Sequence, residues 1–257
     1  LARGSTHISS VVFNHFVLGI GLGLFLAAIT YVVDMKTWRQ FAPYLFGASL
    51  IATALVFIPG LGMEHGGGRR WIDLGFVTLQ PSELLKLGAI VFAAFYFSQL
   101  REETASWKGP VSFLGIMVLP IGIMLLQPDL GTLGIITISV FSIFVAAGAR
   151  VRDIAILVVT ALVVLGGLSL TPKYNYVYER IDTFFNPAEQ NALGDGFQIR
   201  QSLIAIGSGG LAGRGFGQGV QKFTYLPEPM GDSIYAVLAE EFGFIGSVML
   251  VFGFLSF

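Results

Sequence analysis

The chain alternates between long apolar stretches and shorter polar ones. Seven stretches carry few or no charged residues, and each approaches the ~20 helical residues that cross a bilayer core of ~30 Å. Continuously apolar segments in lipid favour helices over strands, because each segment must satisfy its own backbone hydrogen bonds. The pattern predicts an all-α, polytopic transmembrane helix bundle, with spans at about 10–33, 41–59, 82–100, 110–127, 131–149, 153–170 and 233–257.

One polar segment, at about 172–232, is far longer than the other interruptions. A connection of this length that contains charged and aromatic residues usually has a function of its own. We therefore predict a single membrane domain over residues 1–257 that carries a large extracytoplasmic loop. Within this loop, 174–185 suits a helix at the membrane surface, and 197–206 is predicted as an amphipathic helix.

Basic residues in the short loops predict the orientation. The loops between the first and second, third and fourth, and fifth and sixth stretches are basic, and the positive-inside rule makes them cytoplasmic. The loops near 64–80 and 127–132 and the long segment then lie outside. Arg69 and Arg70 are outside against this bias, and the binding of an anion is one reason for them. The cytoplasmic basic residues are Lys36, Arg39, Arg101, Lys108, Arg150 and Arg152.

Composition narrows the class of protein. Hydrophobic residues make up 54% and charged residues 12%, whereas a soluble domain has about 25% charged residues. The net charge of -1 and the scattered basic residues argue against a nucleic-acid partner. Without cysteine there are no disulfides and no thiolate metal sites. Because the chain starts without methionine and ends inside an apolar stretch, we expect it to be a fragment.

Several ionisable residues lie within or next to the predicted spans. Glu83 and Lys86 are three residues apart and share one helical face. They either form a neutral pair that fixes the helix end or line a polar cavity, and we favour the cavity. Asp129 is favoured as the N-cap of the following helix over a role in chemistry, although one residue can do both. Two adjacent carboxylates within a span, Glu240 and Glu241, are costly, so we expect one to have a structural partner.

A glycine cluster at 207–219 follows the predicted amphipathic helix. Its spacing partly matches a dinucleotide-binding fingerprint, but the preceding strand and the βαβ setting are absent. We expect these glycines to let the backbone pass close to helix ends or to a phosphate-bearing ligand.

Asp232 lies directly before the last apolar stretch. One interpretation is that it is the N-cap of that helix. The other is functional, because this carboxylate lies at the boundary of water and membrane, after the turn Pro227-Glu228-Pro229, with other charges on the same predicted side.

The motifs, taken in order, resemble the SEDS family, which comprises RodA and FtsW. The resemblance covers essentially the whole chain, and members of this family usually have ten spans. By this resemblance the chain lacks the first span and the last two, and the segment 219–228 is nearer to FtsW. The motifs are Arg70-Trp71-Ile72, Gln80-Pro81-Ser82-Glu83 with Lys86, Gln127-Pro128-Asp129-Leu130-Gly131-Thr132, Gln198 with Gln201-Ser202, Tyr225-Leu226-Pro227-Glu228, Asp232 and Glu240-Glu241-Phe242-Gly243.

The resemblance implies an inverting peptidoglycan glycosyltransferase that polymerises lipid II at the outer face of the bacterial cytoplasmic membrane. It also implies a role in cell division or cell shape, and a class B penicillin-binding protein as partner. Asp232 matches the essential aspartate of the family, Glu83 and Lys86 a buried ion pair, and Asp129 a position in the central cavity. The chain departs from the family next to the aspartate, where Met230 replaces the usual histidine.

The expected chemistry assigns roles to these residues. Asp232 is the candidate general base, which typically contributes about 10²–10⁴-fold. A divalent cation is a possible cofactor, although the sequence shows no dedicated set of ligands. A lipid flippase or transporter and a non-catalytic scaffold of a synthase complex are the alternative functions. The candidate cations for pyrophosphate are Arg69, Arg70, Lys86, Arg200 and Arg214, and the candidate cavity or structural residues are Glu83, Asp129, Gln198, Gln201, Ser202, Glu228 and Glu240.

Overall fold

The computed structural model describes residues 13–65, 68–73, 78–169, 195–226, 229 and 231–256. The chain falls into two compact units, residues 1–158 and 159–257, and each is described by itself. The prediction of a single membrane domain therefore stays a prediction.

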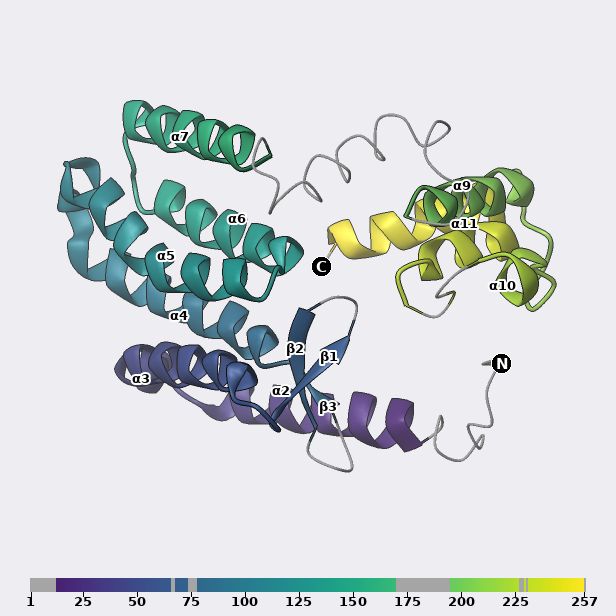
Figure 1. Ribbon diagram of the computed structural model, residues 1–257, viewed down its shortest axis with the longest axis horizontal. Helices are drawn as coiled ribbons and strands as arrows, with labels where there is room; N and C mark the ends of the chain where they lie inside the picture. The colour runs from purple at the N-terminus through teal and green to yellow at the C-terminus, as the bar shows by residue number, and fades with distance from the viewer. Residues whose placement is uncertain are drawn as a thin grey trace. The chain divides into compact units, whose positions relative to one another are not determined.

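Helices form most of the first unit (Figure 1). The sequence folds into helices because its apolar stretches are continuous. The helix ends lie within about three residues of the predicted spans, except that α3 begins at Met35, before the predicted 41. The helices are η1 (Phe13–Gly21, a π-helix), α2 (Leu22–Val32), α3 (Met35–Ala54), η2 (Leu55–Phe57), α4 (Pro81–Leu100), η3 (Arg101–Ala105), α5 (Lys108–Leu126), α6 (Leu130–Ala146) and α7 (Val151–Ser169), which crosses the boundary between the units.

Length and composition mark this as a multi-pass membrane protein. Among the described residues, four helices are long and apolar enough to cross a bilayer, and α6 is a shorter apolar helix. The predicted polytopic helical fold is confirmed. The four helices are Met35–Phe57, Pro81–Leu100, Lys108–Leu126 and Ile234–Ser256.

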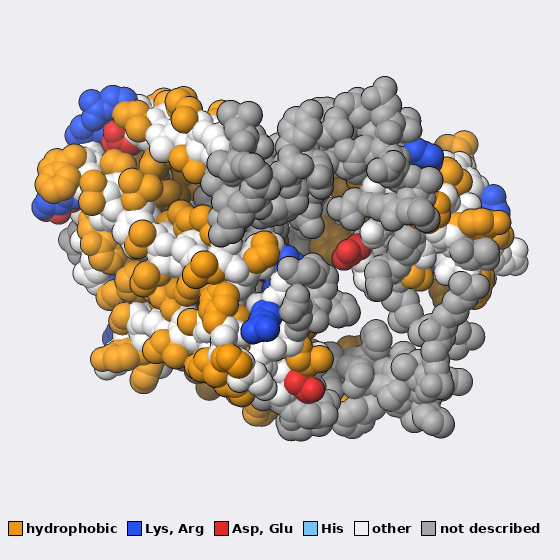
Figure 2. All heavy atoms as spheres, viewed as in Figure 1, with side chains coloured by type: hydrophobic (Ala, Val, Ile, Leu, Met, Phe, Trp, Pro, Cys, Tyr) orange, Lys and Arg blue, Asp and Glu red, His pale blue; other side chains and the backbone are white. Residues whose placement is uncertain are grey.

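The core of the first unit lies between α3, α4, α5 and α6. Phe46 of α3 stacks on Phe92 of α4 with ring centroids 4.9 Å apart, and Phe97 of α4 meets Phe144 of α6 at 5.3 Å. Large apolar side chains such as Leu119 and Ile138 remain exposed on these helices, and Figure 2 shows hydrophobic side chains over much of the visible face. Apolar surface of this extent on helices that can span a bilayer fits contact with lipid.

A small antiparallel sheet occupies the stretch between α3 and α4, where the sequence predicted a loop. Its order is β1 (Gly62–His65), β2 (Gly68–Asp73) and β3 (Thr78–Leu79). Met63 pairs with Trp71 and Glu64 with Arg69, so the register skips Arg70 and forms a bulge. A bulge re-aims the side chain that it carries, which matters for Arg70 below.

The second unit contains α9 (Asp195–Gly209), α10 (Gln221–Thr224) and α11 (Ile234–Ser256). Buried Ala205, Leu226 and Ala236 form its small core. The helix predicted at 197–206 is confirmed as part of α9. The predicted surface helix at 174–185 lies outside the described residues.

α11 is broken at Gly243. This glycine has φ 66° and ψ -165°, a backbone conformation that is essentially confined to glycine. The glycine cluster packs against the break, and Gly213 (φ +80°) lies so close that a Cβ on it would be 2.1 Å from the carbonyl oxygen of Glu241. Of the two expectations for the glycine cluster, close passage by a helix end is confirmed.

Backbone groups freed by the break are paired with the glycine cluster. A helix interrupted in a membrane must have such partners, because lipid offers none. Around the break, the amides of Arg214 and Gly215 donate to the carbonyls of Glu240 and Glu241 at 3.0 Å each, while the amides of Phe244 and Ile245 donate to the carbonyls of Gly210 and Leu211 at 2.9 and 3.1 Å.

Candidate functional site

Asp232 lies in the turn immediately before α11, and its side chain is exposed. The first turn of the helix closes when the amide of Val237 donates to the carbonyl of Ser233. Ser233 therefore occupies the N-cap position, and the N-cap interpretation of Asp232 is wrong. Within the described part of the chain Asp232 makes no hydrogen bond or ion pair, which leaves its carboxylate accessible to a ligand.

Ser233 is held by α9. Its hydroxyl is buried and receives a hydrogen bond from Nε2 of Gln198 at 3.2 Å, and Oγ of Ser202 lies 3.5 Å away. The predicted residues Gln198 and Ser202 thus fix the residue next to Asp232, and they position the start of α11. Gln201 and Arg200 lie on the same helix and are partly buried.

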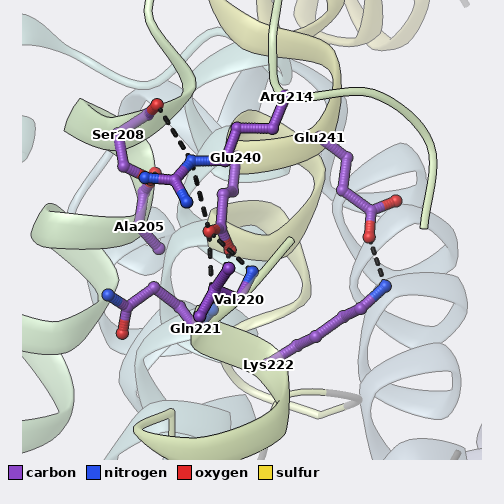
Figure 3. A network of polar contacts seen from close by, with 8 residues as sticks. All are labelled: Ala205, Ser208, Arg214, Val220, Gln221, Lys222, Glu240 and Glu241. Carbon is purple, nitrogen blue, oxygen red and sulfur yellow. Dashed lines mark hydrogen bonds and ion pairs between the residues drawn. The ribbon is translucent and has the colours of Figure 1, made fainter. Parts of the chain in front are cut away.

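Glu240 is fully buried in α11, and its carboxylate is surrounded by donors from the segment 214–221. The amide of Val220 donates to Oε1 at 2.9 Å, and the amide of Gln221 donates to Oε2 at 3.2 Å. The guanidinium of Arg214 lies 3.8 Å away and also donates to the carbonyl of Ser208 at 3.4 Å (Figure 3). Arg214, predicted to bind pyrophosphate, is therefore engaged with Glu240.

Glu241 is the second half of the same network. Lys222 forms an ion pair with its Oε1, and the amide of Gly217 donates to its Oε2 at 2.9 Å. Both adjacent carboxylates thus have structural partners, where the sequence predicted a partner for one. Figure 3 shows them reaching different parts of the segment, with Lys222 on the side of Glu241. We call these two carboxylates and the donors from Arg214, Gly217, Val220, Gln221 and Lys222 the Glu240–Glu241 clamp.

In the first unit, Asp129 is the N-cap of α6. Its Oδ1 accepts from the amide of Thr132 at 3.2 Å, and its Oδ2 accepts from the hydroxyl of Thr132 at 2.9 Å and from Nε2 of Gln80 at 3.4 Å. The capping role predicted for Asp129 is confirmed.

Arg70 and Gln127 connect the sheet to the ends of the helices. From its bulge, Arg70 donates to the carbonyls of Gln127 at 3.4 Å and Pro128 at 2.6 Å. Gln127 is buried and donates to the carbonyl of Thr53 at 2.9 Å. A guanidinium over free carbonyls at the end of α5 stabilises that helix end, so Arg70 has a structural contact besides any role in binding.

Glu83 and Lys86 form the predicted pair, with 2.7 Å between Oε2 and Nζ. The resemblance implied that this pair is buried, but the side chain of Glu83 is 56% exposed and that of Lys86 is 22% exposed. The burial is therefore corrected, while the pairing stands. Arg69 is an exposed residue of β2, and Glu228 lies outside the described residues.

Sequence reasoning missed Lys222, Ser233 and the break at Gly243. Lys222 had one available signal, since two adjacent carboxylates in a span require a cation or several amides. Among the residues that the structure describes, no group of three or more His, Asp or Glu side chains could hold a metal ion.

The model of the FtsW, RodA and SpoVE family, described as "Cell cycle protein", matches residues 2–257. The chain belongs to this family. It is 40% identical over 232 residues to stage V sporulation protein E of Bacillus subtilis, covering 90% of the chain and 63% of that relative. It is 38% identical over 247 residues to the probable peptidoglycan glycosyltransferase FtsW of Coxiella burnetii, covering 93% of the chain and 64% of that relative.

Solved structures of this family have the same fold. A chain in a structure described as "Structural coordination of polymerization and crosslinking by a peptidoglycan synthase complex" superimposes with a TM-score of 0.73 at 31% identity, covering 96% of this chain and 68% of that one. RodA of Thermus thermophilus gives a TM-score of 0.59 at 26% identity, covering 94% of this chain and 61% of RodA. The chain thus spans less than two thirds of the length of several FtsW, RodA and SpoVE relatives.

Proposed function

We propose that this member of the FtsW, RodA and SpoVE family is part of a peptidoglycan glycosyltransferase that polymerises lipid II. The reaction takes place at the outer face of the bacterial cytoplasmic membrane. The family membership and the name of the Coxiella burnetii relative support the activity. The basic loops of the chain support the orientation.

The observation that carries the proposal is the difference between the carboxylates of the second unit. Glu240 and Glu241 are buried and bound by amides and cations, so neither is available to take a proton from a substrate. Asp232 is exposed and makes no contact of this kind within the described residues. A general base needs to reach the hydroxyl group that it deprotonates, and Asp232 meets this requirement.

The proposed step is a single displacement. Asp232 takes the proton from a sugar hydroxyl, whose oxygen forms a bond to the anomeric carbon of a second lipid-linked sugar. The bond from that carbon to the pyrophosphate breaks, the polyprenyl pyrophosphate leaves with the electron pair, and the configuration at the carbon is inverted. Cations stabilise the departing charge. The candidates proposed for this role are Arg69, Arg70, Lys86, Arg200 and Arg214, and of these Arg70, Lys86 and Arg214 also have the structural contacts described above.

A class B penicillin-binding protein is the proposed partner. The support is the structural similarity to a chain from a structure of polymerisation and crosslinking by a peptidoglycan synthase complex. Polymerisation is the step proposed for the present chain, which leaves crosslinking to the partner.

The test is the growth of glycan strands from purified lipid II, without a nucleotide or an ion gradient. We expect Asp232→Asn to abolish polymerisation, because an amide cannot accept the proton, while expression and folding are unchanged. Asp34→Asn is the control: it removes an exposed carboxylate before α3, on the predicted opposite side.

Each alternative function has its own outcome in this assay. Full activity of Asp232→Asn would contradict the base assignment and favour a scaffold. If the unmodified protein, assayed together with its partner, moved lipid II across the bilayer without chain growth, the result would instead favour a flippase.

A further inference from the structure

A groove between α3 and α4 belongs to neither of the polar networks described above. It consists of two adjoining hollows, of about 360 and 340 Å³, which share Arg39 and Phe95. Each volume falls within the range of about 300–1,000 Å³ that is usual for ligand pockets. The first hollow is also lined by Met35, Trp38, Ile90, Val91 and Ala94, and the second by Lys36, Gln40 and Gln99.

The polarity of this groove changes along the helices. The second hollow lies where α3 begins and α4 ends, and the first extends along α4 as far as Ile90. Nine residue steps separate Gln99 from Ile90, which corresponds to about 13.5 Å of helix, close to one leaflet of a core of ~30 Å. The groove is therefore cationic and polar at the predicted cytoplasmic interface and apolar at the depth of acyl chains.

The cations at the mouth have no partner within the described residues. Lys36 and Arg39 are three residues apart in the first turns of α3, both are exposed, and neither forms an ion pair with a described carboxylate. Asp34, directly before α3, and Glu103, shortly after α4, line neither hollow, and Glu103 pairs with Lys108. A phosphate at this position would meet two cations.

We propose that this groove binds an anionic phospholipid of the cytoplasmic leaflet. Arg39 and Lys36 hold the phosphate, for which a guanidinium has matching geometry, and one acyl chain lies along Val91 and Ala94. Basic pockets between helices on the cytoplasmic side are a known mode of lipid recognition, and Trp38 is a residue type that favours the interface. A protein helix that covered the groove would need carboxylates at the depth of Lys36 and Arg39. Phosphates of the leaflet are always present at that depth.

The test uses fluorescence of Trp38, one of three tryptophans in the chain. The protein with Trp71→Phe and Trp107→Phe is reconstituted in phosphatidylcholine vesicles that contain brominated phosphatidylglycerol or, in parallel, brominated phosphatidylcholine. We expect the anionic lipid to quench Trp38 at a lower mole fraction than the neutral one. Arg39→Gln should reduce this preference about fivefold, since a cation near a lipid surface contributes about that factor.

Two variants separate the groove from general membrane effects. Arg150→Gln removes an exposed cation on the same predicted side but outside the groove, and we expect the preference to be unchanged. Ala94→Phe fills the apolar hollow and should weaken quenching by the anionic lipid with both cations intact. Three results would overturn the proposal: equal quenching by both lipids, quenching by neither because protein covers the groove, or equal losses in Arg39→Gln and Arg150→Gln. If Arg39→Gln does not fold, Lys36→Gln makes the same measurement.

Discussion

Among single contacts, we expect the ion pair between Lys222 and Glu241 to contribute most to the free energy of unfolding. The side chain of Glu241 is 6% exposed and that of Lys222 is 21% exposed, so removal of the cation leaves a buried charge with fewer partners. Lys222→Met should destabilise the protein by about 3 kcal/mol, and Lys222→Arg should retain most of the stability. Thermal unfolding in detergent measures both.

An exposed pair provides the control for this prediction. Lys108 and Glu103 are 2.8 Å apart, but their side chains are 48% and 58% exposed, and such pairs contribute about 0–1 kcal/mol. Lys108→Met should therefore change the unfolding temperature little. If both methionine variants lost the same stability, the Glu240–Glu241 clamp would not be a main source of stability.

Single-residue roles differed in how far the sequence could predict them. The cap formed by Asp129 was predictable because its partner Thr132 is three residues away and the motif is local. Asp232 and Ser233 are both residue types that cap helices. Ser233 takes the N-cap position, and its hydroxyl is held by Gln198 of α9, which is distant in the sequence. The partners of Glu240 lie about twenty residues upstream in an irregular segment, which no local pattern specifies.

The break in α11 leads to a prediction at the level of the element. Two features of Gly243 exclude a side chain. Its φ is positive, and a Cβ would lie 2.3 Å from the amide nitrogen of Gly213. Gly243→Ala should destabilise the protein by about 2–3 kcal/mol and lower the unfolding temperature. Gly253→Ala lies in the same helix, where a Cβ meets nothing within 4 Å, and should have almost no effect.

The same helix shows what the sequence could not determine. α11 was predicted as one span because its composition is apolar apart from Glu240 and Glu241, and composition is a local property. Gly243, Gly246 and Gly253 look alike in the sequence, and the first is distinguished only in the structure, by its positive φ and its contact with residues 211–213. The sheet was missed for a related reason, since strands of two to six residues in a glycine-rich stretch show little alternation.

Orientation in the membrane is a property of the whole molecule, and the lack of cysteine makes it easy to test. Met63→Cys and Tyr225→Cys introduce thiols at exposed positions predicted to be outside, and Trp107→Cys introduces one predicted to be inside. We expect a membrane-impermeant thiol reagent to label the first two in intact spheroplasts and the third only after lysis. Labelling of all three, or the reverse pattern, would contradict the positive-inside assignment.

The broken helix also constrains how the protein is made. Four backbone groups around Gly243 are paired with residues 210–215, and in hydrocarbon each would cost several kcal/mol without a partner. The ribosome synthesises 210–215 before α11, so these partners already exist when α11 leaves the exit tunnel. α11 can therefore enter the translocon as an uninterrupted rod and exchange its own hydrogen bonds for those of the upstream segment once the two meet.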